Sequence, residues 1–462
     1  MKRFQTNPLA WMIGSSALVL FLCSSVRHEL LQSNAFDLGY FDQALYLLSR
    51  GLPPVVSFWG YHFLGGHGDW ILYPIALLYV IHPSVYWLFG IQSLALALGA
   101  LPTWHLARQA GLTPKQAITL AWVYLLYPLV FNLNLFDFHP EVIALPLFLG
   151  AILAARAAKL GWFCGAIILI LGCRDALSLT VAAMGAWLWL AEKKRIFGAI
   201  ALGLGITWFW TVTQVVIPHF RPGGVESVPR YAYLGNSLTE ILLNLVVQPQ
   251  RVLSHLITGE NAVYLVLLFL PIAWGLSLRY LAPLIAIVPT LAINLLSTSS
   301  AQKDLIHQYS LPALPFLIVA AIAALAAGKT LIRSPRAILI WSLVGFLALA
   351  KVEYFGGRYL SLLDNWQANR EAMALIQTPG SVLTMARLAP HLGHRPIVKL
   401  AVKEAVGSDP TGFDYVLLDV RHPGVMGSLG MMTTWVQQLQ QTPQFDLRYQ
   451  RDEVYLFIKK NL

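Results

Sequence analysis

The stretch Phe36–Gln43, FDLGYFDQ, follows the first apolar run of the chain, Trp11–Cys23 (WMIGSSALVLFLC), after a short polar segment. The apolar run predicts the first of a series of membrane helices. The stretch FDLGYFDQ then places two carboxylates, Asp37 and Asp42, directly beyond that helix. Ionisable groups are costly at the edge of a bilayer, so those found there usually serve a function. We therefore place a candidate reaction centre in the loop that follows the first helix.

The composition extends this interpretation to the whole chain. Of its 462 residues, 57% are hydrophobic and only 12% are charged, whereas a soluble domain carries about 25% charged residues. The fold class is therefore an α-helical polytopic membrane protein. The net charge of +10 indicates membrane topology rather than nucleic-acid binding. The three cysteines, Cys23, Cys164 and Cys173, form neither a metal-binding spacing nor a disulfide framework.

The lengths of the apolar runs predict about eleven membrane crossings. Residues 71–81 are apolar but short, and they predict a re-entrant or interfacial piece, or the first half of a bent second helix. Residues 238–258 are amphipathic, so we expect them to lie along the membrane surface. The predicted crossings lie near residues 8–26, 84–107, 116–133, 142–158, 161–174, 176–191, 196–217, 261–278, 280–297, 311–328 and 337–355.

The distribution of basic residues predicts the orientation of these helices. With the N-terminus inside, every short basic loop lies on the cytoplasmic face, as the positive-inside rule requires. The opposite face then receives acids, histidines and scattered bases. We expect a multi-pass protein of a bacterial cytoplasmic (inner) membrane, with its N-terminus in the cytoplasm. The inner loops carry Arg108, Lys115, Arg156, Lys159, Lys193, Lys194, Arg195, Arg279, Lys329, Arg333 and Arg336.

The last hundred or so residues differ in composition from the rest. Residues 1–355 form the predicted transmembrane domain, with a long first outer loop at 27–70, and residues 356–462 form a small extracytoplasmic α/β domain. Alternating apolar residues predict strands in this second domain, and amphipathic stretches predict helices. The predicted helices are 361–377 and 431–439, and the predicted strands are 381–385, 415–419, 445–449 and 454–458.

The first outer loop holds the strongest candidates for chemistry. Asp37 is the candidate general base, supported by Asp42, His67 and Asp69, because carboxylates and imidazoles in a partly dehydrated site have tunable proton affinity. The alternative is that Asp37 caps a helix, Asp42 is a solvated loop acid and the others form a hydrogen-bonded turn. A divalent cation held by His62, His67, Asp69 and Asp37 is a further possibility, although the spacing is not specific to a metal.

Two later outer loops add substrate-binding candidates. Asp137, His139 and Glu141 place three titratable groups within five residues, although a glutamate in the first turn of a helix is favoured by the helix dipole alone. Arg174 and Asp175 follow a predicted helix. Their functional interpretation is a phosphate-facing guanidinium held by its own acid. The alternative is a local salt bridge that closes a hairpin.

Four more ionisable residues of the outer face complete the candidate set. Arg221, Arg230, Lys303 and His307 would suit a phosphate or diphosphate group near a membrane cavity. Lys303 and His307 are four residues apart and could share a helical face, and Arg221 lies in a flexible stretch that could close over a substrate. For any one of these residues, a contact with a lipid headgroup is the more common role. The sequence contains no P-loop, GxSxG, HExxH or dinucleotide-binding fingerprint.

Five stretches together resemble a bacterial family of uncharacterised polytopic membrane proteins. This family is similar to the GT-C glycosyltransferases, which include the protein mannosyltransferases and the aminoarabinose transferase of lipid A. The five stretches are FDLGYFDQ at 36–43, HGD at 67–69, LFDFHPE at 135–141, CRDA at 173–176 and HQYSLPALPFL at 307–317.

The resemblance implies a fold, an activity and a set of partners. A GT-C-like enzyme has an acid soon after its first helix, which acts as base on an acceptor hydroxyl, and Asp37 is the matching position. The implied donor is a sugar on a polyprenyl phosphate. The implied partners are membrane lipids and a glycan, lipid or protein acceptor, without nucleic acid. No cofactor is implied with certainty, and a divalent cation is possible.

The sequence therefore leaves two alternative functions. The first is an inverting glycosyltransferase at the outer face of the cytoplasmic membrane, with Asp37 as base. The second is a proton- or ion-coupled transporter or a lipid flippase, in which the same acids are relays. Relays of that kind are expected near the middle of the membrane on broken helices. Here the acids gather at the outer ends of the predicted helices, which favours the enzyme.

Overall fold

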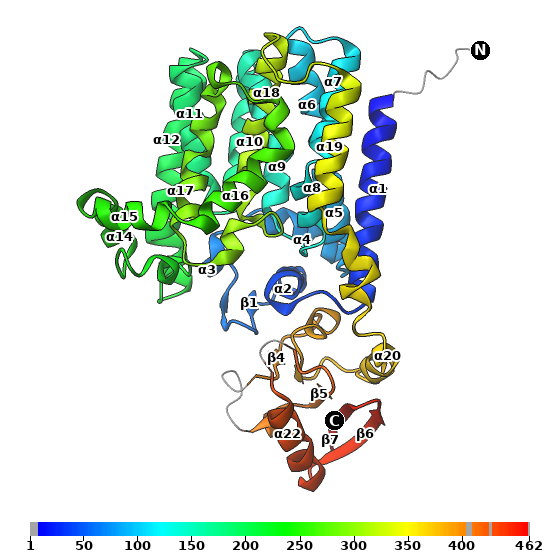
Figure 1. Cartoon of the computed structure of the whole chain (residues 1–462). Helices are drawn as coiled ribbons and strands as arrows, with labels where there is room; N and C mark the ends of the chain where they lie inside the picture. The colour runs from blue at the N-terminus through cyan, green and yellow to red at the C-terminus, as the bar shows by residue number, and fades with distance from the viewer. Residues whose placement is uncertain (1–7, 403–408, 425–426, 461–462) are drawn as a thin grey trace. The chain divides into compact units, whose positions relative to one another are not determined.

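The computed structural model describes residues 8–402, 409–424 and 427–460. The chain forms two compact units (Figure 1). The first, which we call the helical unit, contains Met1–Phe21, Leu64–Ile71 and Gly90–Lys351. The second, which we call the mixed unit, contains Leu22–Phe63, Leu72–Phe89 and Val352–Leu462. The predicted first outer loop is thus divided between the two units. A domain boundary at residue 355 stays a prediction.

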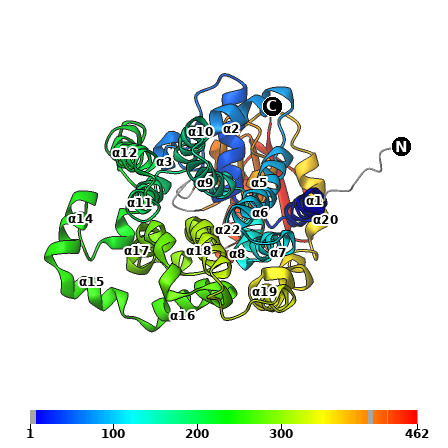
Figure 2. The ribbon, with the colours of Figure 1, turned by 90° about the horizontal axis from the view of Figure 1, so that it is seen from above.

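The helical unit is a bundle of α-helices interrupted by short 3₁₀ and π-helical turns (Figure 2). Helix α1 (Pro8–Glu29) passes from the helical unit into the mixed unit, and α5 (Tyr86–Leu98) begins in the mixed unit and ends in the helical unit. The other helices of this unit are α3 (Leu64–His67), α6 (Ala100–Gln109), α7 (Pro114–Leu125), α8 (Pro128–Asn134), α9 (Glu141–Arg156), α10 (Leu160–Leu171), α11 (Leu177–Leu190), α12 (Arg195–Thr211), α13 (Ile217–Phe220), α14 (Leu238–Val247), α15 (Pro249–Leu256), α16 (Gly259–Phe269), α17 (Val288–Leu296), α18 (Leu314–Ala326) and α19 (Pro335–Leu349).

The described residues contain four helices that are long and apolar enough to cross a membrane, or seven if each of three bent pairs is one span. All seven overlap predicted crossings, although the bent pair of Pro249–Leu256 and Gly259–Gly275 begins within the segment 238–258 that we expected to lie along the membrane surface. The remaining four predicted crossings correspond to shorter helical segments, such as the 12-residue α10. An α-helix of that length rises about 18 Å, which is less than the roughly 30 Å thickness of the hydrocarbon core. The chain is a multi-pass membrane protein, and the count of eleven stays a prediction.

Small residues bring helices of the bundle close together. A Cβ atom added to Gly185 of α11 would lie 2.4 Å from the backbone nitrogen of Leu202 in α12, and one added to Gly205 would lie 2.6 Å from that of Ala182. Such close approach is how helices associate where lipid removes the hydrophobic driving force. Both views show α11 and α12 side by side (Figures 1 and 2). The amphipathic helices α14 and α15 lie at the rim of the bundle, with Leu243 and Val246 exposed.

The mixed unit combines the start of the first outer loop with the C-terminal sheet. Its first part holds a π-helical turn, η1 (Ala35–Gly39), then α2 (Tyr40–Ser49), β1 (Val55–Val56), β2 (Tyr61–His62) and α4 (Leu72–Ile81). Its C-terminal part holds α20 (Trp366–Ala374), β3 (Val382–Thr384), β4 (Val398–Leu400), β5 (Tyr415–Asp419), α22 (Leu429–Gln441), β6 (Phe445–Arg451) and β7 (Val454–Lys459).

The C-terminal strands form one mixed sheet in the order β4-β3-β5-β7-β6. Strand β3 runs parallel to β4 and β5, while β7 is antiparallel to β5 and β6. The four predicted strands and both predicted helices are present, although the first helix begins at Trp366 rather than residue 361. Strand β4 was not predicted, because its three residues are too few to show an alternating pattern.

Candidate active site

The loop that carries His67 is held in the helical unit by two close backbone contacts. A Cβ atom on Gly65 of α3 would lie 3.2 Å from the carbonyl carbon of Phe220 at the end of α13. Gly68 has φ +66°, and a Cβ there would lie 2.3 Å from Cγ2 of Val212. Only glycine combines this backbone conformation with this approach. The stretch Leu64–His67 is therefore seated tightly on the segment from Val212 to Phe220.

His67 links the first outer loop to the CRDA loop. Its Nδ1 lies 3.2 Å from Oδ1 of Asp175, and its Nε2 lies 2.8 Å from Nη2 of Arg174. The backbone N–H of Asp175 also donates to the carbonyl of His67, at 3.1 Å. Arg174 directs Nη1 at Oε1 of Glu141, and its Nε is 4.0 Å from Asp175. The main acid of Arg174 is therefore Glu141 of the second outer loop, and not its sequence neighbour.

The acids of this cluster are buried, and burial and neighbouring charges shift their pKa values in opposite directions. Asp69 is 1% exposed, and its Oδ1 has no hydrogen-bond partner among the described residues. Burial raises the pKa of Asp69 well above its usual value, the nearby charge of Glu141 raises it further, and Arg174 opposes the shift. Burial also disfavours the charged form of Asp175, but the hydrogen bond from His67 and the charge of Arg174 outweigh it and lower its pKa. The cluster thus contains one carboxyl whose pKa is raised, Asp69, and one whose pKa is lowered, Asp175.

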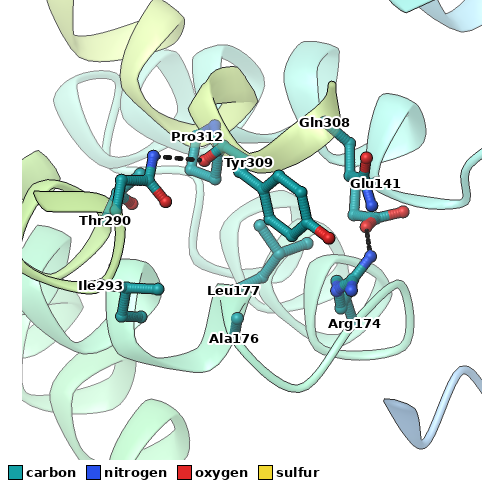
Figure 3. Close-up of a pocket in the computed structure, with 10 residues that line it drawn as sticks. Glu141, Arg174, Ala176, Leu177, Thr290, Ile293, Gln308, Tyr309 and Pro312 are labelled. Atoms are coloured by element: carbon teal, nitrogen blue, oxygen red, sulfur yellow. Dashed lines mark hydrogen bonds and ion pairs between the residues drawn. The ribbon is translucent and has the colours of Figure 1, made fainter. Parts of the chain in front are cut away.

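A cavity of about 50 Å³ lies beside this cluster (Figure 3). The ring of Tyr309 projects into it, with the hydroxyl directed toward the Arg174–Glu141 pair. Buried Gln308 Oε1 and Glu141 Oε2 have no hydrogen-bond partner among the described residues. The cavity therefore brings a cation, a phenol and two spare acceptor atoms together. Its lining residues are Glu141, Arg174, Ala176, Leu177, Thr290, Ile293, Asn294, Gln308, Tyr309 and Pro312.

A second guanidinium reaches the same tyrosine. Nη1 of Arg230 donates to the hydroxyl of Tyr309 at 3.1 Å. The guanidinium carbons of Arg230 and Arg174 lie 5.3 Å and 5.9 Å from the centroid of the Tyr309 ring. Arg230 is half-buried and has no carboxylate partner among the described residues. It therefore keeps donors for an anion, whereas those of Arg174 are largely used by Glu141 and His67.

The second outer loop is organised by Gln92 of α5. Its Nε2 donates to the carbonyl of Asp137 at 2.9 Å, and its Oε1 accepts from the backbone N–H of His139 at 3.1 Å. Asp137 has φ +87°, a left-handed conformation that is strained for a residue other than glycine. The His139 ring stacks on Phe136 at a centroid distance of 5.2 Å. Within the predicted group of three, Glu141 pairs with Arg174, and the His139 ring stacks on Phe136.

The remaining cations have partners of their own. Arg221 pairs with Glu226 at 2.8 Å, Lys303 pairs with Glu260 at 2.9 Å, and His307 Nδ1 lies 2.7 Å from Asp304. The expectation that Lys303 and His307 share a helical face is wrong, because the short 3₁₀ turn that contains Lys303 ends there. His307 still approaches the second outer loop, where its ring meets that of Phe136 at 4.3 Å.

The two catalytic candidates, Asp37 and Asp42, lie in the mixed unit. Asp37 is half-buried in η1, and the side chain of Asn34, not that of Asp37, caps this turn by accepting from Phe36 N–H at 3.1 Å. Asp42 is fully buried in α2, so the alternative of a solvated loop acid is wrong. Its Oδ1 accepts from the hydroxyl of Tyr79 at 2.8 Å. A catalytic role for either acid stays a prediction.

The possible divalent cation gains no support from the geometry. Across residues 8–402, 409–424 and 427–460, no group of three or more His, Cys, Asp or Glu side chains is arranged to hold a metal ion. The donor set around His67 includes Arg174, whose positive charge opposes a cation at that position. Metal dependence stays untested.

Sequence reasoning missed two residues of the cavity region, Tyr309 and Gln308. Both lie inside the stretch HQYSLPALPFL, which carried the family resemblance without being assigned a role. Arg230 was among the predicted phosphate-binding cations, but it lies 79 residues before its partner Tyr309, so no local pattern relates the two. Among the predicted residues, the structure brings together His67, Asp69, Glu141, Arg174 and Asp175.

Comparison with known proteins is consistent with this architecture. Residues 27–456 match the sequence model of a family described as predicted membrane protein (DUF2079). No curated protein matches the sequence. The chain is similar to the crystal structure of ArnT from Cupriavidus metallidurans bound to undecaprenyl phosphate, with a TM-score of 0.53. The similarity covers 98% of each chain at 14% sequence identity, so it is a likeness of fold.

Proposed function

Because this chain belongs to the DUF2079 family of predicted membrane proteins and has an ArnT-like fold, we propose that it is a GT-C-type glycosyltransferase. The proposed reaction moves a sugar from a polyprenyl phosphate to an acceptor hydroxyl at the outer face of the cytoplasmic membrane. The supporting likeness extends over nearly the whole length of both chains, and that relative was crystallised with undecaprenyl phosphate. The C-terminal domain at 356–462 is then extracytoplasmic.

The observation that carries the proposal is the approach of Arg174 and Arg230 to Tyr309 beside a cavity. Guanidinium groups are the side chains best suited to bind phosphate, because their planar donors match its oxygens. Arg230 supplies the spare donors, and the Tyr309 hydroxyl adds another hydrogen-bonding group. The cavity, at about 50 Å³, is too small for a whole lipid. The polyprenyl chain would extend away from it, into the membrane.

The proposed chemistry is a single inverting displacement. Asp37 takes the proton of the acceptor hydroxyl while that oxygen attacks the anomeric carbon of the donor sugar. The bond between this carbon and the phosphate oxygen breaks, and its electron pair leaves with the lipid phosphate. A phosphate is already a good leaving group, so the main requirement is stabilisation of its growing negative charge. We assign that role to Arg230, with Arg174 and Tyr309 as neighbours. Asp137, His139 and Glu141 position sugar or acceptor hydroxyls.

The test uses the full-length protein in lipid nanodiscs, supplied with polyprenyl-phosphate sugars that carry a radioactive label in the sugar. We expect release of polyprenyl phosphate and transfer of label to an extract of cell-envelope acceptors. Arg230→Ala should lower the affinity for undecaprenyl phosphate about tenfold or more, since a hydrogen bond to a charged group contributes about 1.5–3 kcal/mol. Arg251→Ala is the matched control, because Arg251 is exposed and its guanidinium donates to the backbone carbonyl of Tyr233.

Two results would contradict the proposal. One is movement of the intact lipid-linked sugar across the bilayer without cleavage of its sugar–phosphate bond, which is the behaviour of a flippase. The other is equal affinity for undecaprenyl phosphate in Arg230→Ala, Arg251→Ala and the wild-type protein, which would remove Arg230 from the donor site.

A further inference from the structure

The segment of the C-terminal region between β3 and β4 packs against the turn that carries Asp37. The backbone N–H of Ala35 donates to the carbonyl of Ala386 at 2.9 Å. A Cβ atom on Gly39 would lie 3.6 Å from Cγ of Pro390. Ala35 also shares a small buried cluster with Ala389 and residues of β4. Residues 386–390, ARLAP, therefore support η1 from within the mixed unit.

The strongest link between the two segments is an ion pair to a buried carboxylate. Nε2 of His394 lies 3.0 Å from Oδ1 of Asp42, the same atom that accepts from the hydroxyl of Tyr79. Asp42 is 0% exposed, whereas the side chain of His394 is 37% exposed. The imidazole also stacks on Tyr46 of α2, at a centroid distance of 5.2 Å and an interplanar angle of 12°. Because a carboxylate only accepts, Nε2 of His394 carries a proton.

The residue next to Asp42 continues the same connection. Nε2 of Gln43 donates to the carbonyl of Arg395 at 3.1 Å, and Oε1 of Gln43 accepts from the backbone N–H of Ser57 at 2.9 Å. The backbone N–H of Val398 donates to Oγ of Ser57 at 2.9 Å. Helix α2 is therefore tied to the β3–β4 connection at two consecutive residues.

These ties reach Asp37 through a continuous helix. Gly39, where η1 meets α2, has helical φ and ψ of −61° and −36°, and the N–H of Tyr40 donates to the carbonyl of Asp37. A helix transmits orientation along its axis because its hydrogen-bonded turns resist independent rotation. An apolar contact at Asp42 would cost less than a buried charge. The hydrogen bond between His394 and Asp42 instead fixes the orientation of α2, since a hydrogen bond requires good alignment of its donor and acceptor.

We propose that His394 is a positioning residue: acting through Asp42, it holds α2 and the adjoining turn so that Asp37 keeps the orientation that sugar transfer requires. This inference rests on the proposed function. Asp42 is then part of the positioning device rather than a group that touches substrate. The role of the C-terminal domain is then to hold the segment that carries Asp37 in its catalytic orientation.

The test compares His394→Ala and His394→Gln with His422→Ala in the full-length protein. His422 is a matched control, because it is another C-terminal histidine on a carboxylate, with Nε2 2.9 Å from Asp364. In His394→Ala we expect kcat to fall about tenfold or more with KM for the lipid donor within about twofold, since misorientation of a catalytic group affects the chemical step. His394→Gln should recover much of the loss, because its amide can donate to Asp42. His422→Ala should behave as wild type.

Amide hydrogen exchange of residues 34–49 gives a readout that does not depend on activity. We expect faster exchange in this segment for His394→Ala than for His422→Ala. Wild-type kcat and wild-type exchange in His394→Ala would overturn the inference, as would a lower yield of folded protein with unchanged kcat per folded molecule. If the wild-type protein transfers no sugar, the proposed function fails. The exchange result then decides separately whether His394 orders the loop.

Discussion

Nη2 of Arg174 lies 2.8 Å from Nε2 of His67, and this contact determines where the imidazole carries its proton. A guanidinium has only donors, so Nε2 of His67 must accept. The ring proton is then on Nδ1, which donates to Asp175 at 3.2 Å. His67 therefore bridges the guanidinium of Arg174 and the carboxylate of Asp175. The cluster beside the cavity is held by directional hydrogen bonds, and a change at its centre should affect every member.

Arg174→Lys should destabilise the protein strongly. A lysine ammonium cannot reach Glu141 and His67 in the same fork geometry, so a buried carboxylate loses its partner. Breaking a buried pair costs about 3–5 kcal/mol, and thermal unfolding in detergent would measure it as a lower Tm. Arg156→Lys is the control, because Arg156 makes a two-point contact with Glu192 that is more exposed. That change should cost about 1 kcal/mol or less. Equal losses of Tm would contradict the central role of Arg174.

Asp69→Asn should change how stability depends on pH. The pKa of Asp69 is raised in the fold, so above its ordinary value near 4 the unfolded chain releases a proton that the folded chain retains. The contribution of Asp69 to the free energy of unfolding is then fully present below its ordinary pKa, and it is lost as pH rises through the pKa of Asp69 in the folded protein. Asparagine cannot ionise, so the stability of the variant should not decrease with rising pH in this way. At high pH its Tm should exceed that of the wild type.

Asp175→Asn should change the pH dependence of Tm in the opposite direction. The pKa of Asp175 is lowered in the fold, so its contribution is present above the ordinary value and is lost as pH falls through the folded pKa. This variant should have a lower Tm than the wild type at neutral pH, with a smaller difference in acid. Parallel Tm profiles for the two variants would show that the assigned directions of the two pKa shifts are wrong.

Gly68→Ala should disturb the packing of the segment that carries His67 against Val212. It combines an unfavourable positive φ with a Cβ placed 2.3 Å from Val212. Gly60→Ala separates the two effects, because Gly60 has φ +76° and nothing within 4 Å of an added Cβ. The conformational effect alone costs about 1–2 kcal/mol. The loss of Tm should therefore be larger for Gly68→Ala than for Gly60→Ala, and a ranking in the other order would refute the close packing at Val212.

Asp37→Asn should abolish sugar transfer while leaving the fold intact. Asparagine is nearly the same size but cannot take the proton of the acceptor, and loss of a general base typically lowers the rate by about 10²–10⁴-fold. The measurement is single-turnover transfer from a labelled polyprenyl-phosphate sugar, with Tm measured in parallel. Asp446→Asn is the control, because Asp446 is exposed and pairs with Lys460 at 3.4 Å. Wild-type transfer by a folded Asp37→Asn protein would falsify the assignment of the base.

Local pattern was enough to predict the secondary structure and part of the site. Apolar run lengths identified the helices, and alternation identified four of the five C-terminal strands. Charge placement singled out His67, Asp69, Glu141, Arg174 and Asp175, which the structure brings into one cluster. What the pattern could not supply was the pairing within that cluster, such as the choice of Glu141 over Asp175 as the main partner of Arg174.

The sequence by itself determined that this chain enters a membrane and that its ionisable groups gather in loops at the ends of apolar helices. Those properties depend on composition and on short periodic patterns, and both are local. The tertiary structure decided that Arg230 meets Tyr309 and that His394 meets Asp42, which lie 79 and 352 positions apart. Contacts over such distances depend on which buried surfaces fit together and which polar groups must find partners away from water. No window of neighbouring residues contains that information.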